Sequence, residues 1–141
     1  MTDFRIFAHG KEFDPDACAS RSALKFSRLW RRGELKCPDG TSAYETSGVE
    51  ILLAAEQLPF YSQVGIARSF LEENETALQK LGQFDGVETY ILGLERTIEH
   101  SPGLVGFTVW FPESLMSLSL RIGINLVAYV QLAPLVVPAD A

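Results

Sequence analysis

Basic side chains crowd into one segment of this chain, residues 21–36, and could bind an anionic ligand. The segment holds six lysines and arginines against one glutamate, a local charge of +5, in a chain whose formal net charge is −6. The rest of the chain therefore carries −11. Aromatic rings interleave the cations, a combination typical of phosphate or nucleic-acid binding. The residues that we single out there are Trp30, Arg31, Arg32 and Glu34.

The same segment has a structural interpretation. Lys and Arg side chains on an edge strand discourage pairing between sheets, and Trp30 would then pack in the core. The negative net charge also disfavours non-specific nucleic-acid binding. We therefore expect an edge strand here, with a small-ligand pocket near Trp30–Glu34 as the alternative. The basic strip could also pair with the chain's own acidic helix, internally or across a dimer.

Three carboxylates form the second candidate binding surface: Glu72, Glu73 and Glu75. They lie mostly off the apolar stripe of a predicted helix and so face water. A solvated helix face would explain them, but they could also belong to an acidic surface that meets a basic partner protein. Further members of that surface would be Glu50, Glu56 and Asp85. We expect the acidic surface, rather than the basic segment, to bind the partner, because a charge of −11 spread over the rest of the chain produces the wider electrostatic field.

No catalytic or metal-binding motif can be assigned from the sequence. His100 is flanked by a glutamate and a serine, but adjacent loop residues rarely place a nucleophile and a base correctly, and no Gly-x-Ser-x-Gly motif is present. Helix capping explains the clustered Glu12, Asp14 and Asp16 more simply than a metal, which needs three or four convergent ligands. We therefore predict no catalytic residue, no metal and no cofactor.

Composition places the chain among globular proteins. Its 141 residues, 47% of them hydrophobic and 21% charged, fit a single domain. We expect this domain to cover residues 1–132 and residues 133–141 to form a flexible tail. The N-terminus lacks the features of a signal peptide, and Cys18 and Cys37 lack metal-ligand spacing, so we expect a cytoplasmic protein with reduced thiols. The uncharged stretch 122–139 alternates like a strand, and we predict no membrane span there.

The longest apolar stretch runs from Leu104 to Leu132 and predicts a strand, a short helix and a strand. Pro112 would begin the helix and Gly123 would end it. We expect these elements to form the centre of a sheet with one helix laid on it. The predicted centre of the core consists of Phe107, Val109, Leu115, Leu126, Ala128 and Val130.

Shorter elements precede this stretch. Alternating apolar residues predict a first strand over residues 4–9. Asp14 is then placed to cap a helix whose first residue is Pro15. A second strand is predicted over residues 24–30, and another over residues 87–97 after an Asp-Gly turn.

The middle of the chain holds the clearest predicted helix. It would begin with Ser62 as its cap and end with Gly82 in the left-handed conformation. Its apolar stripe consists of Ala67, Phe70, Leu71, Leu78 and Leu81. Before it, residues 41–54 look extended, with Gly48 as a bulge or bend. A helix through residues 49–57 is the alternative, because leucine, alanine and glutamate there favour helices.

Two parts of the chain repeat one pattern. Residues 4–30 and residues 105–130 each predict a strand, a short helix opened by Phe-Asp-Pro or Phe-Pro-Glu, and a strand. Two such units suggest a duplicated, split β-α-β plan of the ferredoxin-like kind. The predicted fold is thus α+β, with a mainly antiparallel sheet and helices packed on one face.

Three short motifs carry a resemblance to a known family. They are Phe13-Asp14-Pro15, Trp30-x-x-Gly33-Glu34, and a closing Pro-Glu-x-Leu followed by Ile-Gly-Ile-x-Leu. With the order of elements, they resemble the bacterial domain-of-unknown-function family numbered 4279. The resemblance implies an α+β bacterial cytoplasmic domain and supplies no activity or catalytic residue. Small acidic α+β domains of this kind also look similar to immunity proteins of bacterial toxin systems.

These observations lead us to expect a non-enzymatic, protein-binding domain. Its most concrete form is an immunity-type protein whose acidic surface neutralises a basic toxin. The first alternative is a small-ligand-binding or enzymatic domain with a pocket near Trp30–Glu34. The second is a structural homodimer whose sheet edge pairs with itself.

Overall fold

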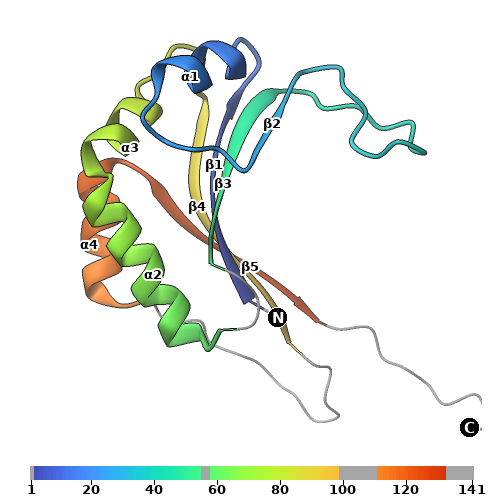
Figure 1. Ribbon diagram of the computed structural model, residues 1–141. Helices are drawn as coiled ribbons and strands as arrows, with labels where there is room; N and C mark the ends of the chain where they lie inside the picture. Colours follow the sequence, from blue (N-terminus) through green and yellow to red (C-terminus); the bar gives the residue numbers. More distant parts are fainter. Residues whose placement is uncertain (1, 55–57, 99–110, 133–141) are drawn as a thin grey trace, which may run out of the picture.

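The computed structural model describes residues 2–54, 58–98 and 111–132 of the chain (Figure 1). Its elements, in order, are β1 (Thr2–Gly10), α1 (Pro15–Arg21), β2 (Arg28–Trp30), β3 (Ser47–Ala54), α2 (Phe60–Glu73), α3 (Glu75–Gly82), β4 (Thr89–Ile98), α4 (Glu113–Ile122) and β5 (Asn125–Leu132). The strands form one sheet, so the predicted α+β class is confirmed.

The described sheet has the strand order β2-β3-β1-β4-β5. β1 pairs antiparallel with β3 and β4, β2 pairs antiparallel with β3, and β5 pairs parallel with β4. The first four strands thus follow the ferredoxin-like plan, in which each helical connection skips one strand. The second split unit is β3–α2–α3–β4, whereas the sequence pattern assigned it to residues 105–130. The motif α4–β5 is an addition that extends the sheet beside β4.

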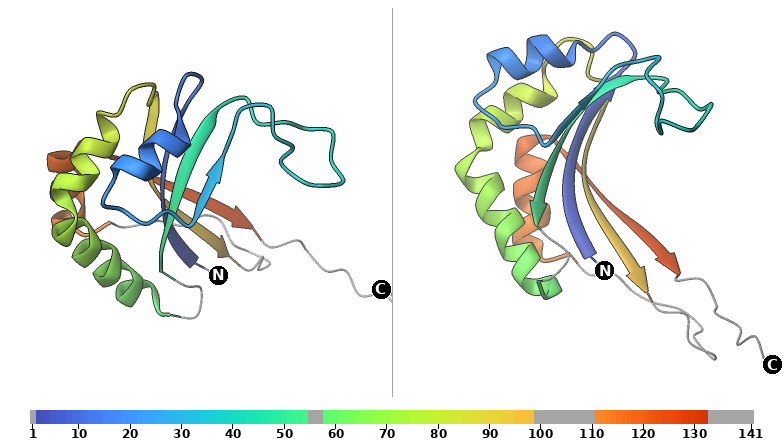
Figure 2. Two further views of the ribbon diagram at one scale, coloured as in Figure 1. Left: turned by 45° about the horizontal axis from the view of Figure 1, so that its top comes forward. Right: turned by 45° about the vertical axis from the view of Figure 1, so that its right-hand side comes forward.

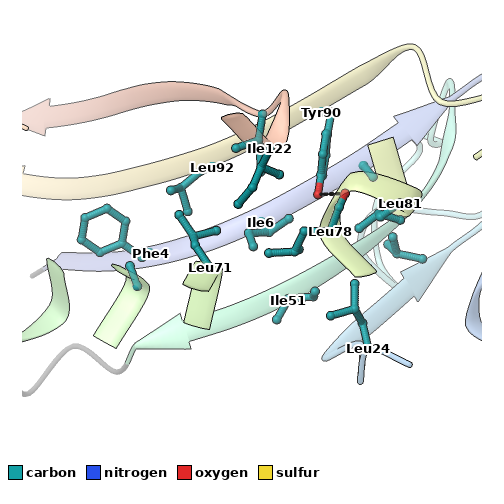
Figure 3. Packing of buried hydrophobic residues seen from close by; sticks show 14 of the residues in the cluster. Phe4, Ile6, Leu24, Ile51, Leu71, Leu78, Leu81, Tyr90, Leu92 and Ile122 are labelled. Atoms are coloured by element: carbon teal, nitrogen blue, oxygen red, sulfur yellow. Dashed lines mark hydrogen bonds between the residues drawn. The ribbon is translucent and has the colours of Figure 1, made fainter. Parts of the chain in front are cut away.

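The hydrophobic core lies between the helices and one face of the sheet, as Figure 3 shows. Phe4 and Ile6 of β1 and Leu92 of β4 point toward the helices and are fully buried. Leu71 of α2 and Leu78 of α3 meet them from the other side and are also fully buried. In the strand order, β1 is the middle strand of the described sheet, with two strands on each side.

The prediction that the C-terminal third forms the centre of the sheet is wrong for β5. This strand ends the described sheet, and Leu126, Ala128 and Val130 are only half-buried. An edge strand that is covered by a helix can be as apolar as a central strand. The apolar composition of β5 therefore led to the wrong prediction of its place in the sheet. Leu115 of α4 is fully buried, as predicted. Two other predicted core residues lie outside the described part of the chain: Phe107 and Val109.

The described helices all cover the same face of the sheet (Figure 2). The long predicted helix begins at Phe60 after Pro59, not at a Ser62 cap, and Asn74 divides it into α2 and α3. Its predicted apolar stripe is confirmed, because four of the five members are buried and Phe70 packs partly buried against the core. The four buried members are Ala67, Leu71, Leu78 and Leu81.

Two predicted helix ends are confirmed. The Oδ1 atom of Asp14 accepts hydrogen bonds from the backbone N–H groups of Asp16 and Ala17, both at 3.1 Å, and so caps α1. Gly123 ends α4 with φ +87°, a conformation in which a side chain would be strained.

Gly82 does not have the predicted left-handed conformation. It is the last residue of α3, and a Cβ atom there would stand 2.8 Å from the ring of Tyr90. The glycine therefore allows close packing of α3 on β4. The Tyr90 hydroxyl donates a buried hydrogen bond of 2.7 Å to the carbonyl oxygen of Leu78, which joins the same two elements.

The strand predicted over residues 24–30 is shorter, because only Arg28–Trp30 pair with β3. β3 runs unbroken from Ser47 to Ala54, so the helical alternative is wrong for residues 49–54; residues 55–57 lie outside the described ranges. Gly48 is no bulge, since it stands in register with Trp30. A Cβ atom on Gly48 would overlap the Trp30 indole.

Between β2 and β3, residues 31–46 leave the sheet as a narrow ribbon that we call the arm (Figure 1). Backbone hydrogen bonds hold it together, from Gly33 N–H to Tyr44 O (2.9 Å), Tyr44 N–H to Glu34 O (2.8 Å) and Lys36 N–H to Ser42 O (3.0 Å). Within the described ranges, no helix combines the length and apolar character needed to cross a membrane.

Candidate functional site

A solvent-open cavity of about 680 Å³ separates the end of α1 from the corner between α2 and α3. We call it the α1–α3 hollow, after the two helices that line it; Figure 1 shows α1 above α3. Its lining residues are Cys18, Arg21, Ser22, Ala23, Glu72, Glu73, Asn74, Glu75, Thr76, Ala77, Lys80, Leu81 and Phe84. The structure thus brings the three predicted carboxylates to a concave surface rather than to a plain helix face.

A second, shallower hollow of about 570 Å³ continues the first. The two share Arg21, Lys80 and Phe84, and the second adds Glu12, Asp14, Ala17, Gln83 and Asp85. Together they are lined by six carboxylates and two cations, a formal charge of −4. Of the further carboxylates named from the sequence, Asp85 lines the second hollow, Glu50 lies buried on the sheet and Glu56 is outside the described ranges.

The three predicted carboxylates differ in their partners. Glu75 is half-buried and forms an ion pair with Arg121 of α4 at 2.5 Å, which raises the pKa of Arg121. Glu72 stands 3.8 Å from Arg68 on the same helix. Glu73 is exposed and has no ion pair with any described residue. Glu72 and Glu73 are thus available to a partner, while Glu75 holds α3 against α4.

An apolar floor completes the hollow. Leu81 and Cys18 are buried, and Phe84 is half-buried with its ring edge-on to Phe13 at 5.7 Å. Burial raises the pKa of the Cys18 thiol to about 11, so the thiol stays protonated and unreactive at neutral pH. The floor can accept an aliphatic stem, but it supplies no nucleophile.

Three of the six cations of the basic segment, Arg28, Arg31 and Arg32, have ion pairs among the described residues. Arg31 binds Asp16 of α1 at 2.5 Å and Glu34 at 3.2 Å, and the Asp16 carboxylate raises the pKa of Arg31. Arg32 stands 4.0 Å from Glu12. The predicted residues Arg31, Arg32 and Glu34 are exposed. Arg31 is already paired with two carboxylates, which weakens the case for an anion site there, whereas Arg32 makes only the 4.0 Å contact.

Trp30 itself is 6% exposed, as the edge-strand interpretation expects. Its indole stacks on Tyr44 with centroids 5.7 Å apart, and the guanidinium of Arg28 lies 4.9 Å from the indole centroid. His9 packs beside it with ring centroids 6.3 Å apart. These contacts leave little of the ring for a base or another stacking ligand.

Sequence reasoning missed that Arg21 and Lys80 line one cavity. Arg21 belonged to the basic segment, and Lys80 drew no attention. Lys80 lies three residues after Ala77, so a helical projection places the two on the same side of α3, the side that lines the hollow. Nothing local indicated that the end of α1 would pack near that side.

The described residues contain no group of three or more His, Cys, Asp or Glu side chains placed to hold a metal. His100 lies outside the described ranges. Comparison with known proteins gave no match, since no family model fits the chain and no curated protein or solved structure matches it. The family resemblance therefore stays a prediction, and the case for function depends on the geometry of the two hollows.

Proposed function

We propose that this chain is a non-enzymatic, protein-binding domain that receives a basic segment of a partner protein in the α1–α3 hollow. The observation that carries the proposal is the meeting of Glu72 and Glu73 with an apolar floor in a cavity of about 680 Å³. Pockets for small molecules have volumes of about 300–1,000 Å³, so a hollow of this size has room for side chains of a partner.

The chemistry of the hollow suits lysine and arginine side chains. These residues bury an aliphatic stem while the charged head stays near water. Leu81 and Phe84 offer apolar surface for the stem, and Glu72 and Glu73 offer acceptors for the head. The acidic surroundings would also raise the association rate of a basic partner, an effect that falls as salt increases.

The narrower form of the proposal is an immunity-type protein that neutralises a basic toxin in a bacterial cytoplasm. It is supported by the acidic hollows and by the resemblance to small acidic α+β domains. A ligand site near Trp30–Glu34 is less favoured, because Arg31 there is already paired with two carboxylates and Trp30 is buried.

Affinity capture from cells of the native host tests the proposal. We expect the wild-type chain to retain a basic protein that the double variant Glu72→Lys/Glu73→Lys does not retain. Both carboxylates are on the surface, so the substitutions should leave the fold intact, as circular dichroism would show.

The matched control is Asp39→Lys/Glu45→Lys, which makes the same change in net charge on the arm. Both of these residues are exposed and lie outside the two hollows. If the arm variant loses the partner and the helix variant keeps it, the binding surface is not the α1–α3 hollow and the proposal is wrong.

A further inference from the structure

Two cations form the boundary between the two acidic hollows. Arg21 of α1 and Lys80 of α3 each line both cavities, and Phe84 lies with them. We call these three residues the ridge. Both cations are exposed, and neither has an ion pair within 4.0 Å among the described residues. The ridge thus presents two charges that the described part of the chain does not neutralise.

Local structure favours these residue types at the positions of the ridge. Arg21 and Lys80 occupy the last turns of their helices, where the helix dipole favours a cation. Phe84 is held by its edge-on contact with Phe13. The charges along the surface therefore alternate, with carboxylates in the α1–α3 hollow, cations on the ridge, and carboxylates again in the second hollow.

A segment that crosses this surface would meet both signs of charge. Basic side chains are attracted to the carboxylates on either side, but a third basic side chain over the ridge would be repelled by Arg21 and Lys80. An acidic side chain over the ridge would instead meet a guanidinium, which binds carboxylates through paired hydrogen bonds. The ridge therefore sets a charge order that an all-basic segment does not satisfy.

We propose that the partner segment carries an acidic residue between two basic blocks. This inference rests on the proposed function, and it specifies the charge order of the partner rather than its basic character alone. Arg21 and Lys80 would act as specificity-determining residues, selecting one basic protein among several.

Three synthetic peptides test the charge order. Each has three lysines at both ends and an Ala-X-Ala centre, with X as glutamate, glutamine or lysine. Their affinities for the full chain are measured by fluorescence anisotropy at low salt. We expect the glutamate peptide to bind best and the lysine peptide worst, with a step of about threefold at each exchange, as single exposed charge pairs produce.

The double variant Arg21→Gln/Lys80→Gln should lose this order and bind the lysine peptide best. The variant Lys11→Gln/Lys25→Gln is the matched control, because it removes two exposed lysines outside both hollows and should keep the wild-type order.

The outcomes separate this inference from the proposed function. If the peptides bind through Glu72 and Glu73 but with equal affinity, the charge order is wrong and the basic-partner proposal stands. If none of them binds, or if Glu72→Lys/Glu73→Lys leaves their binding unchanged, both proposals are wrong.

Discussion

The two faces of the sheet are buried by different means. On the helix-covered face, side chains such as Phe4, Ile6 and Leu94 are fully buried among apolar neighbours. On the face that the described helices leave uncovered, β1 carries Arg5 and β3 carries Glu50, and Glu50 is only 4% exposed. Burial on the first face comes from apolar packing, whereas on the second it comes with charge pairing.

The charged face contains a chain of interactions across three strands. Arg5 of β1 donates to Asp3 at 3.0 Å and to Glu50 of β3 at 2.8 Å. Arg28 of β2 pairs with the other oxygen of Glu50 at 3.0 Å and donates to the Tyr44 hydroxyl at 3.1 Å. Buried charges are tolerated only when they are paired and hydrogen-bonded, so this face should depend on each partner being present.

The sharpest test of the contrast makes one substitution on each face. Leu92→Ala empties a fully buried site in β4 and should lower the free energy of unfolding by about 2–5 kcal/mol. Leu52→Ala in β3 is the control, because Leu52 is 45% exposed on the other face and should cost less than about 1 kcal/mol. Urea denaturation measures both. Equal losses would mean that the two faces are buried alike.

A second change targets the charged face. Glu50→Gln removes the carboxylate that Arg5 and Arg28 share, and we expect a loss of about 1–3 kcal/mol. The loss stays below that of a fully buried pair, because both arginines keep contact with water. Glu95→Gln, at an exposed position of β4, is the control. A neutral result for Glu50→Gln would show that the network contributes nothing to stability.

A smaller effect should appear in the pH dependence of stability. Burial lowers the pKa of His9, whose Nδ1 lies 3.2 Å from the Thr46 hydroxyl. The unfolded chain therefore binds a proton at His9 more readily than the folded chain does. The contribution of neutral His9 to the free energy of unfolding is complete above about pH 6.5 and declines as the pH falls below that value. In the His9→Gln variant, the urea denaturation midpoint should change less between pH 7.5 and pH 5.5 than it does in the wild-type chain. His100→Gln controls for the other histidine, and an unchanged slope in the His9 variant would contradict the assignment.

The smallest expected effect on stability concerns the two free cysteines. Cys37 is exposed on the arm, whereas Cys18 is buried with a raised pKa, so a thiol reagent at pH 7.5 should label one thiol quickly and the other only in denaturant. Cys37→Ser should remove the fast reaction and change the free energy of unfolding by less than about 0.5 kcal/mol. Rapid labelling of both thiols would show that the face of α1 that carries Cys18 is not buried.

Local patterns predicted most of the elements but not their neighbours. The spacing of Leu71 and Leu78 marked the buried side of α2 and α3, and Asp14 marked the start of α1. The position of β5 could not be predicted this way, because its apolar residues fit a central strand and an edge strand equally well. Gly48 and Gly82 looked like a bend and a helix end, but the Trp30 and Tyr90 rings that require them come from other elements.

The candidate site was predicted only in part. Charge composition pointed to Glu72, Glu73 and Glu75 but could not show that Glu75 pairs with Arg121, 46 residues away. Likewise, the cations of the basic segment were visible as a cluster, while their carboxylate partners, Asp16 and Glu12, lie on other elements. Ion pairs and hollows form only when distant parts of the chain pack together. Sequence patterns therefore reveal the charged residues but not their partners.

The central place of β1 has a consequence for how the protein is made. This strand leaves the ribosome before both of its neighbours, and the later one, β4, ends at Ile98, 88 residues after Gly10. At about 5–20 residues per second, translation of that interval takes roughly 4–18 s. During this interval, the apolar side of β1 is not yet fully covered by the later helices, and the edge of β1 that pairs with β4 has no hydrogen-bonding partner. The nascent chain therefore exposes apolar surface and an unpaired strand edge during those seconds, which are the features that favour aggregation.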